Sequence, residues 1–195
     1  EDVCTGCGLC QEKCPRRVVD TAFEAGMGKR KAIYVPFSQS IPNIPVIDRD
    51  SCLFFTRGRC QLCEKNCPTG AIDYEQEDEI VEIAVGAIVV ATGFRMWDPA
   101  LLPQYGYGKS PNIITGLQFE RLTSAIGPTD GEILTDDGKK PEKVAIIHCV
   151  GSRDERAHAY CSRFCCMYSL KQAHQIKDKT GAEVTSIYMD MRTFG

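Results

Sequence analysis

Twelve cysteines are the residues of this chain best suited to chemistry, and eight of them form two groups near the start. In each group, three cysteines are followed, after a spacer of three residues, by a fourth cysteine that precedes a proline. Closely spaced thiolates that end in Cys-Pro are typical ligands of four-iron clusters. The first group reads Cys4-x2-Cys7-x2-Cys10-x3-Cys14-Pro15, and the second reads Cys52-x7-Cys60-x2-Cys63-x3-Cys67-Pro68.

The fourth cysteine of each group is expected to bind the cluster of the other group. In two-cluster ferredoxins, the cysteine after the three-residue spacer points away from its own group. Gly6 and Gly8 would let the backbone approach the sulfurs. The first cluster would then be held by Cys4, Cys7, Cys10 and Cys67, and the second by Cys14, Cys52, Cys60 and Cys63.

Two other uses of these cysteines have to be weighed. Structural zinc sites take cysteines in pairs separated by a long spacer, unlike the three within seven residues found here. Disulfide scaffolds occur in short secreted chains whose cysteines are spread along the sequence. The spacing therefore favours iron–sulfur clusters. The longer spacer after Cys52 lengthens a loop over the second cluster, so we expect altered solvent exposure and reduction potential without loss of a ligand.

The remaining four cysteines lie between Cys149 and Cys166, and the sequence leaves three roles open for them. A helix N-terminus lowers a thiol pKa, which would suit a redox disulfide. A buried cysteine also serves as a small apolar side chain, and this interpretation fits Cys166 best. Cys161 and Cys165 are candidate ligands of a further cluster, completed by residues outside this chain.

Apolar patterning predicts the elements that position these groups. The first half has short strand-like segments at 31–36 and 46–48. The apolar run at 86–93 ends in glycine and predicts a strand buried on both faces of a parallel sheet. The second half predicts a helix at 117–125, a strand at 144–150, a helix at 162–179 and a strand at 183–189. The last three would form a parallel strand–helix–strand unit.

The run at 86–93 carries the element Ala91-Thr92-Gly93, which resembles one in flavoproteins of the thioredoxin reductase type. The glycine there lets the backbone approach FAD, so these three residues are candidate FAD contacts; a core strand and turn would give the same pattern. A G-x-G-x-x-G motif for the FAD pyrophosphate is absent, so that part of the site would precede Glu1. The acid-containing loop after Gly151 argues against NAD(P) binding.

Composition and length limit the partners and the cellular compartment that we expect for this chain. The 195 residues are 43% apolar and 25% charged with a net charge of −3, so we expect no nucleic-acid partner. No apolar run reaches the length of a membrane span, and no signal peptide is visible. Grouped cysteines without an export signal favour the reducing cytoplasm. Both ends look cut, so we expect the chain to be part of a longer protein.

Five segments, in this order, resemble the A subunit of heterodisulfide reductase: 4–10, 29–36, 89–94, 149–154 and 160–168. The resemblance implies an α/β fold, in which a two-[4Fe–4S] ferredoxin-like (α+β) module is inserted in a Rossmann-type FAD/NAD(P)-binding flavoprotein domain, incomplete at both ends. The implied domains are the ferredoxin-like module at 1–76, the end of the FAD-binding domain with a connecting segment at 77–141, and the start of a degenerate second dinucleotide-binding-like domain at 142–195.

The same resemblance implies an oxidoreductase subunit of methanogens and related anaerobes that performs flavin-based electron bifurcation. FAD would send one electron to subunits that reduce a disulfide and the other towards ferredoxin. The implied partners are the other subunits of such a complex and a ferredoxin, hydrogenase or formate dehydrogenase type of electron donor. The implied cofactors are two [4Fe–4S] clusters, FAD in the full-length protein, and a further [4Fe–4S] cluster with Cys161 or Cys165 as ligand.

For this chain alone we expect electron transfer through the two clusters. All eight thiolates would be used as ligands, which leaves no iron open to a substrate. The alternative function is that of a simple electron carrier, a two-cluster ferredoxin fused to an inert α/β domain. Flavin in the full-length protein would distinguish the first interpretation from the second.

Overall fold

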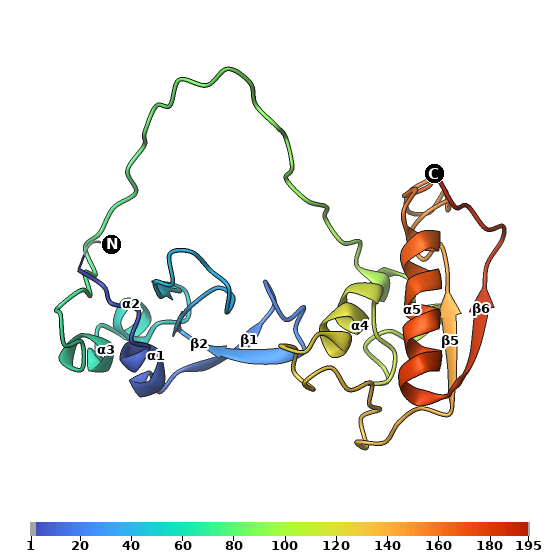
Figure 1. Cartoon of the computed structure of the whole chain (residues 1–195), viewed down its shortest axis with the longest axis horizontal. Coiled ribbons are helices and arrows are strands. Elements are labelled where there is room, and N and C mark those ends of the chain that lie inside the picture. Colours follow the sequence, from blue (N-terminus) through green and yellow to red (C-terminus); the bar gives the residue numbers. More distant parts are fainter. Residues whose placement is uncertain (1–2, 195) are drawn as a thin grey trace. The chain divides into compact units, whose positions relative to one another are not determined.

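The chain forms two compact units in a computed structural model that describes residues 3–194. The units are Glu1–Gly93 and Phe94–Gly195, and each has its own helices and strands (Figure 1). The first unit contains both ferredoxin-type cysteine groups, and the second contains the four later cysteines. Among the described residues, no helix combines the length and the apolar character needed to cross a membrane.

The first unit is built from short helices and two small antiparallel sheets. Its elements are α1 (Leu9–Lys13), β1 (Arg17–Asp20), β2 (Gly28–Lys31), β3 (Ile33–Tyr34), β4 (Val46–Ile47), α2 (Leu53–Arg57) and α3 (Leu62–Lys65). Strand β1 pairs with β2, β3 pairs with β4, and α1 packs against α3. The two helices that contact each other each carry the third cysteine of a group, Cys10 on α1 and Cys63 on α3.

The strand expected at 31–36 is divided between the two sheets at Ala32. This residue is 1% exposed. Its N–H donates to the carbonyl of Arg16 at 3.2 Å, and its own carbonyl accepts from the Asp48 N–H at 2.8 Å. Because these bonds point to different sheets, the chain passes from β2 into β3 at this position. The segment expected at 46–48 is confirmed as β4.

Arg30 on β2 links this hairpin to the end of β4. Its guanidinium lies 2.9 Å from a carboxylate oxygen of Asp48, and the two side chains are only 17% and 21% exposed. The same guanidinium lies over the ring of Tyr34, 3.8 Å from its centroid. The side chain of Lys31 donates to the carbonyl of Cys14, which holds the end of α1 against β2. Polar side chains thus fix the cysteine-bearing loops to the sheets.

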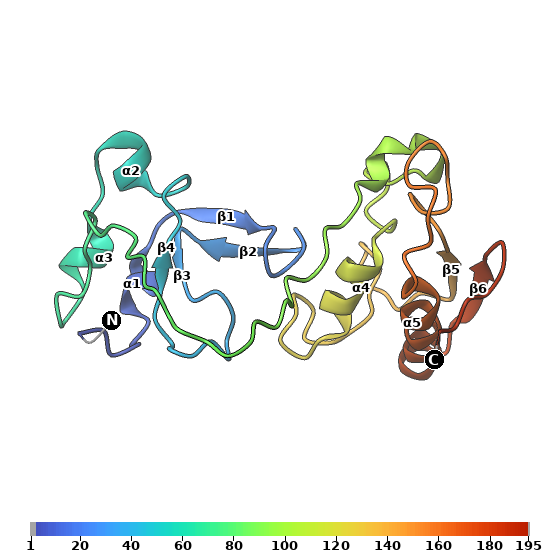
Figure 2. The same ribbon diagram turned by 90° about the horizontal axis from the view of Figure 1, so that it is seen from above.

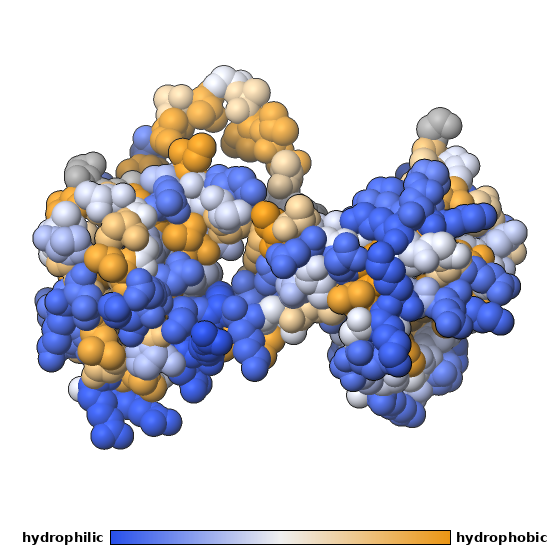
Figure 3. Space-filling model, turned by 60° about the horizontal axis from the view of Figure 1, so that its bottom comes forward, coloured by the Kyte–Doolittle hydropathy of each residue, from blue (hydrophilic) through white to orange (hydrophobic). Residues whose placement is uncertain are grey.

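The strand predicted at 86–93 is not formed, and this prediction was wrong for the chain as described. Its side chains are open to solvent, with Ile88, Val89 and Val90 exposed by 82%, 89% and 79%. A strand buried on both faces needs neighbouring strands on its edges and helices over its faces. Among the described residues 3–194, no strand pairs with this run. We call residues 78–94 the strap; Figure 3 shows mostly hydrophobic residues along it.

The second unit contains the predicted parallel strand–helix–strand unit. Its elements are the 3-10 turns η1 (Pro99–Leu101) and η2 (Pro103–Tyr105), then α4 (Gly116–Thr123), β5 (Lys143–Ile147), α5 (Cys165–Thr180) and β6 (Glu183–Ile187). Strands β5 and β6 pair in parallel from Lys143 and Glu183 to Ile147 and Ile187. Helix α5 lies along this pair (Figure 2), and it ends at Gly181, whose φ is 75°. The helix predicted at 117–125 is confirmed as α4.

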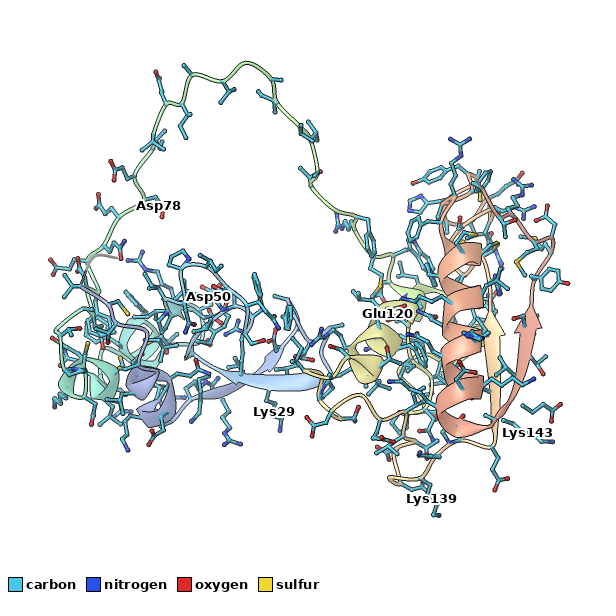
Figure 4. All side chains as sticks on the ribbon, viewed as in Figure 1. Lys29, Asp50, Asp78, Glu120, Lys139 and Lys143 are labelled. Atoms are coloured by element: carbon cyan, nitrogen blue, oxygen red, sulfur yellow. The ribbon has the colours of Figure 1, made fainter. Side chains whose placement is uncertain are left out.

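A small core fixes α4 and α5 on the sheet. Phe119 of α4 and Ile176 of α5 are buried together, with Val144 of β5 packed against them. Outside the core, Glu120 accepts hydrogen bonds from Lys171 at 2.6 Å and from Gln172 at 2.9 Å; Figure 4 labels Glu120 on α4. These contacts hold α5 against α4.

Candidate iron–sulfur centres

A cavity in the first unit brings one cysteine of the first group together with three of the second. Its sulfur-bearing residues are Cys14, Cys52, Cys60 and Cys63. Cys14 directly follows α1, Cys52 directly precedes α2, Cys60 lies between α2 and α3, and Cys63 lies on α3. These are the four residues that the sequence assigned to the second cluster.

The chemistry of the cavity fits a four-iron cluster. Its other walls are largely apolar, with Ile33, Ile47 and Leu53 among them, and neither carboxylate nor imidazole is among its lining residues. Thiol donors set among apolar walls suit a cluster that is bound by thiolates alone.

The first group is only partly gathered. Cys10 is 9% exposed, and burial raises the pKa of its thiol, with the nearby thiols of Cys63 and Cys4 adding to the effect. The N–H of Gly6 donates to the sulfur of Cys4 at 3.5 Å. Cys7 is exposed.

The fourth cysteine of the second group has neighbours of its own. The sulfur of Cys67 accepts a hydrogen bond from the N–H of Ala71 at 3.2 Å, and this bond lowers the pKa of the Cys67 thiol.

Gly6 and Gly8 both adopt left-handed backbone conformations. Their φ angles are 67° and 75°, in the left-handed region that glycine adopts readily. At Gly6 a Cβ atom would lie 2.8 Å from the backbone oxygen of Asn43. This glycine therefore allows the loop between Cys4 and Cys7 to pass close to a second segment.

Tyr74 is a neighbour of the second centre that the sequence reasoning missed. Its hydroxyl oxygen lies 3.0 Å from the sulfur of Cys63, and its ring stacks on Phe54 at 4.0 Å between centroids. Burial raises the pKa of the Cys63 thiol, while the hydrogen bond with Tyr74 opposes that rise. Burial and the Cys63 sulfur both raise the pKa of Tyr74, so its hydroxyl keeps its proton. The only local signal was the aromatic pair in the long spacer, Phe54-Phe55.

The four later cysteines lie in the region between the end of β5 and the first turn of α5. Burial raises the pKa of the Cys165 thiol, and the nearby thiols of Cys166, Cys149 and Cys161 raise it further. Cys149 follows β5 with a left-handed φ of 60°. All four are free thiols in this structure. The sequence had named only Cys161 and Cys165 as candidate ligands; Cys149 joins them because the carboxyl end of a parallel strand meets the start of the following helix.

Cys166 is held from the other side by the end of the chain. It is 4% exposed, and its sulfur accepts a hydrogen bond from the N–H of Arg192 at 3.4 Å. Burial also raises the pKa of Tyr168, one turn along α5, to about 12, with the Cys165 thiol adding to the effect. Cys166 is therefore enclosed between α5 and the segment that contains Arg192.

The candidate FAD contacts Ala91, Thr92 and Gly93 lie on the exposed strap. Gly93 has a φ of 75°, and no described atom would lie within 4 Å of a Cβ placed there. At Gly151, by contrast, a Cβ would lie 2.3 Å from the ring of Trp97. The indole therefore packs directly on the backbone of the loop that follows β5.

Comparison with known proteins agrees with the sulfur-lined first unit. The family described as the 4Fe-4S dicluster domain matches residues 3–71. The first unit therefore contains a domain for two [4Fe–4S] clusters, and the chain is an iron–sulfur protein.

Curated relatives match along the whole chain. The A subunit of the H2:CoB-CoM heterodisulfide,ferredoxin reductase from Methanothermobacter thermautotrophicus is 50% identical over 198 residues, which is all of this chain and 29% of its own length. The iron-sulfur A subunit of CoB–CoM heterodisulfide reductase from Methanocaldococcus jannaschii is 48% identical with the same coverage. The A subunit of the ferredoxin:CoB-CoM heterodisulfide reductase from Methanosarcina mazei is 42% identical, over 24% of its length.

The chain is thus a homologue of part of the A subunit of heterodisulfide reductase, which is an oxidoreductase. It spans less than a third of the length of these curated relatives.

Proposed function

We propose that the first unit transfers single electrons through two [4Fe–4S] clusters, within an oxidoreductase subunit of the heterodisulfide reductase type. The observation that carries this proposal is the cavity that joins Cys14 to three thiols of the second group. A cysteine of one sequence group among the ligands of the other is the crossed arrangement of two-cluster ferredoxins.

The proposed ligand sets follow from this crossing. The second cluster takes the four cysteines that line the cavity, and the first takes the remaining four. Burial of Cys10 beside Cys4 supports the first set. The sets are Cys4, Cys7, Cys10 and Cys67 for the first cluster, and Cys14, Cys52, Cys60 and Cys63 for the second.

A bound [4Fe–4S] cluster supplies reversible one-electron chemistry. With four thiolates for each cluster, every iron has its protein ligand, so the module binds no substrate at iron. Residues of the chain hold the sulfurs, and the apolar walls formed by Ile33, Ile47 and Leu53 limit the access of water to them. The module would therefore relay electrons and make or break no bonds of a substrate.

We place FAD in the full-length protein, with Ala91, Thr92 and Gly93 among its contacts. The open surroundings of Gly93 support a close approach of a ligand to the backbone. We expect the module at 1–76 to be inserted in a Rossmann-type domain that includes 77–141, followed by a second dinucleotide-binding-like domain from 142. The indole of Trp97 on Gly151 argues against NAD(P) here, because a pyrophosphate would need that backbone.

We further propose that Cys161 and Cys165 bind an additional [4Fe–4S] cluster. The nearby thiols of Cys149 and Cys166 support this, because they offer enough sulfur for a complete set. In the full-length protein, Cys165→Ala should remove about four irons relative to the parent protein. Unchanged iron content would contradict the additional cluster and indicate that these cysteines have a structural role.

The proposed partners are the other subunits of a heterodisulfide-reductase-like complex and a ferredoxin, hydrogenase or formate dehydrogenase type of electron donor, in the cytoplasm of an anaerobe. Ferredoxin appears in the names of two of the three relatives described above, together with a heterodisulfide. One of these names also includes H2. These names support a subunit in which FAD divides electron pairs between a disulfide and ferredoxin.

The relay is tested in the full-length complex with both Cys60 and Cys63 replaced by alanine. We expect ferredoxin-linked electron flow to be abolished while FAD content is retained, because the flavin site is built from other segments. Both quantities are measured in the same preparation, together with iron and labile sulfide. Unchanged electron flow would contradict the relay, and loss of FAD would show that the module supports the flavin site instead.

A further inference from the structure

The hydroxyl of Tyr74 contacts a sulfur of the proposed second cluster. The two atoms, Tyr74 Oη and Cys63 Sγ, are 3.0 Å apart, and with a free thiol either one could donate the proton. Once Cys63 binds iron as a thiolate, its sulfur carries no proton and only accepts. The phenol, whose ordinary pKa is about 10, is then the donor.

Aromatic contacts hold the Tyr74 ring in place on two sides. Phe54 stacks on it with 4.0 Å between centroids and 24° between planes. Phe55 meets the same ring edge-on at 5.9 Å and 71°. Aromatic pairs of this kind contribute about 0.5–1.5 kcal/mol beyond the area they bury. The hydroxyl is therefore directed at the sulfur by packing on the ring.

Arg49 completes this arrangement from the loop after β4. Its guanidinium donates to the backbone oxygen of Tyr74 at 3.3 Å and lies over the ring of Phe55, 4.7 Å from the centroid. Both the backbone and the side chain of Tyr74 are thus fixed by the same set of neighbours. We call Arg49, Phe54 and Phe55 the Tyr74 clamp.

The clamp exists because the second group has a longer spacer than the first. The seven residues between Cys52 and Cys60 provide α2, which carries both phenylalanines and ends at Gly58 with a φ of 63°. The two residues between Cys4 and Cys7 leave no room for such a helix. The sulfur of Cys4 instead accepts the longer backbone bond from Gly6, at 3.5 Å.

From this geometry, and resting on the proposed two-cluster function, we propose that Tyr74 is a positioning residue of the second cluster. Its hydroxyl donates a hydrogen bond to the Cys63 thiolate and raises the reduction potential of that cluster. Reduction adds one electron to the cluster and its thiolates, so a donor aimed at a thiolate stabilises the reduced form more than the oxidised form. The long spacer therefore acts on potential through Tyr74.

The test is Tyr74→Phe in the full-length protein, which keeps the stacked ring and removes the hydroxyl. The potential of the second cluster is measured by a redox titration followed by EPR, with its signal assigned by its loss in Cys60→Ala. We expect a fall of about 59 mV, a tenfold change in the one-electron equilibrium. Tyr34→Phe is the matched control, because the hydroxyl of Tyr34 contacts no thiol among the described residues, and its potentials should stay unchanged.

Iron and labile sulfide are measured first, so that two kinds of failure remain distinct. An unmodified protein without the second cluster would contradict the proposed function. Full cluster content with equal potentials in Tyr74→Phe and the parent would overturn the role of Tyr74 alone. If Tyr74→Phe fails to retain the cluster, 3-fluorotyrosine at position 74 provides the second measurement. As a stronger donor it should raise the potential, and an unshifted or lowered potential would overturn the inference.

Discussion

Alanine at position 6 should destabilise the first cysteine loop far more than alanine at position 8. Both glycines have a left-handed φ, in which a side chain costs about 1–2 kcal/mol. At Gly6 a Cβ would also lie 2.8 Å from the oxygen of Asn43, whereas at Gly8 no described atom lies within 4 Å. Such overpacking adds about 1–3 kcal/mol. Gly6→Ala should therefore destabilise the loop by about 1–3 kcal/mol more than Gly8→Ala does.

The assay is the rate at which an iron chelator bleaches the visible absorbance of the loaded protein under anaerobic conditions. The added strain belongs to the closed loop, so it favours opening, and about 1.4 kcal/mol corresponds to a tenfold change in rate. Gly6→Ala should bleach at least about fivefold faster than Gly8→Ala, with both faster than the parent. Equal rates for the two variants would refute the contact with Asn43 as the source of the difference.

Three further predictions concern ligands, stability and cofactor choice. Anaerobic preparation should give about eight irons from the two cysteine groups. The EPR spectrum of Cys14→Ala should match that of Cys60→Ala and differ from that of Cys7→Ala, because Cys14 and Cys60 are assigned to the same cluster. Stoichiometric zinc without labile sulfide would contradict the clusters. Arg30→Met should lower the free energy of unfolding in urea by about 2 kcal/mol, because it removes a charge-assisted hydrogen bond between two largely buried side chains, Arg30 and Asp48, and a loss near zero would show that the ion pair contributes little. NADPH alone should leave the flavin of the full-length protein oxidised, and bleaching at turnover rates would show the loop after β5 to be a nicotinamide site.

The parallel strand–helix–strand unit could be predicted because its signals are local. A β-branched run gives β5, a long periodic segment gives α5, and Gly181 marks the end of that helix. The dicluster module could be predicted from cysteine spacing for the same reason, since all the relevant residues repeat at short intervals. The assignment of individual cysteines to clusters remains a prediction.

Other features depend on contacts that no local pattern records. Helix α2 has only five residues, too few to show a helical period, and the contact of Tyr74 with Cys63 joins residues eleven positions apart. The approach of Cys149 to the later cysteines needs the parallel pairing of β5 with β6. The run at 86–93 has the composition of a buried strand, but composition supplies no hydrogen-bonding partners, and the described chain leaves it unpaired.

The strap has a consequence for handling this polypeptide in the laboratory. Residues 87–91 are consecutive apolar residues without charge or proline, and the side chains of Ile88, Val89 and Val90 are mostly exposed. Short β-branched segments of this kind associate with copies of themselves as stacked strands, because every unpaired N–H and C=O then finds a partner. A preparation of this polypeptide should therefore aggregate with rising concentration. One that ends at residue 77 should remain monodisperse, and the acidic residues before the strap would then form its carboxyl terminus.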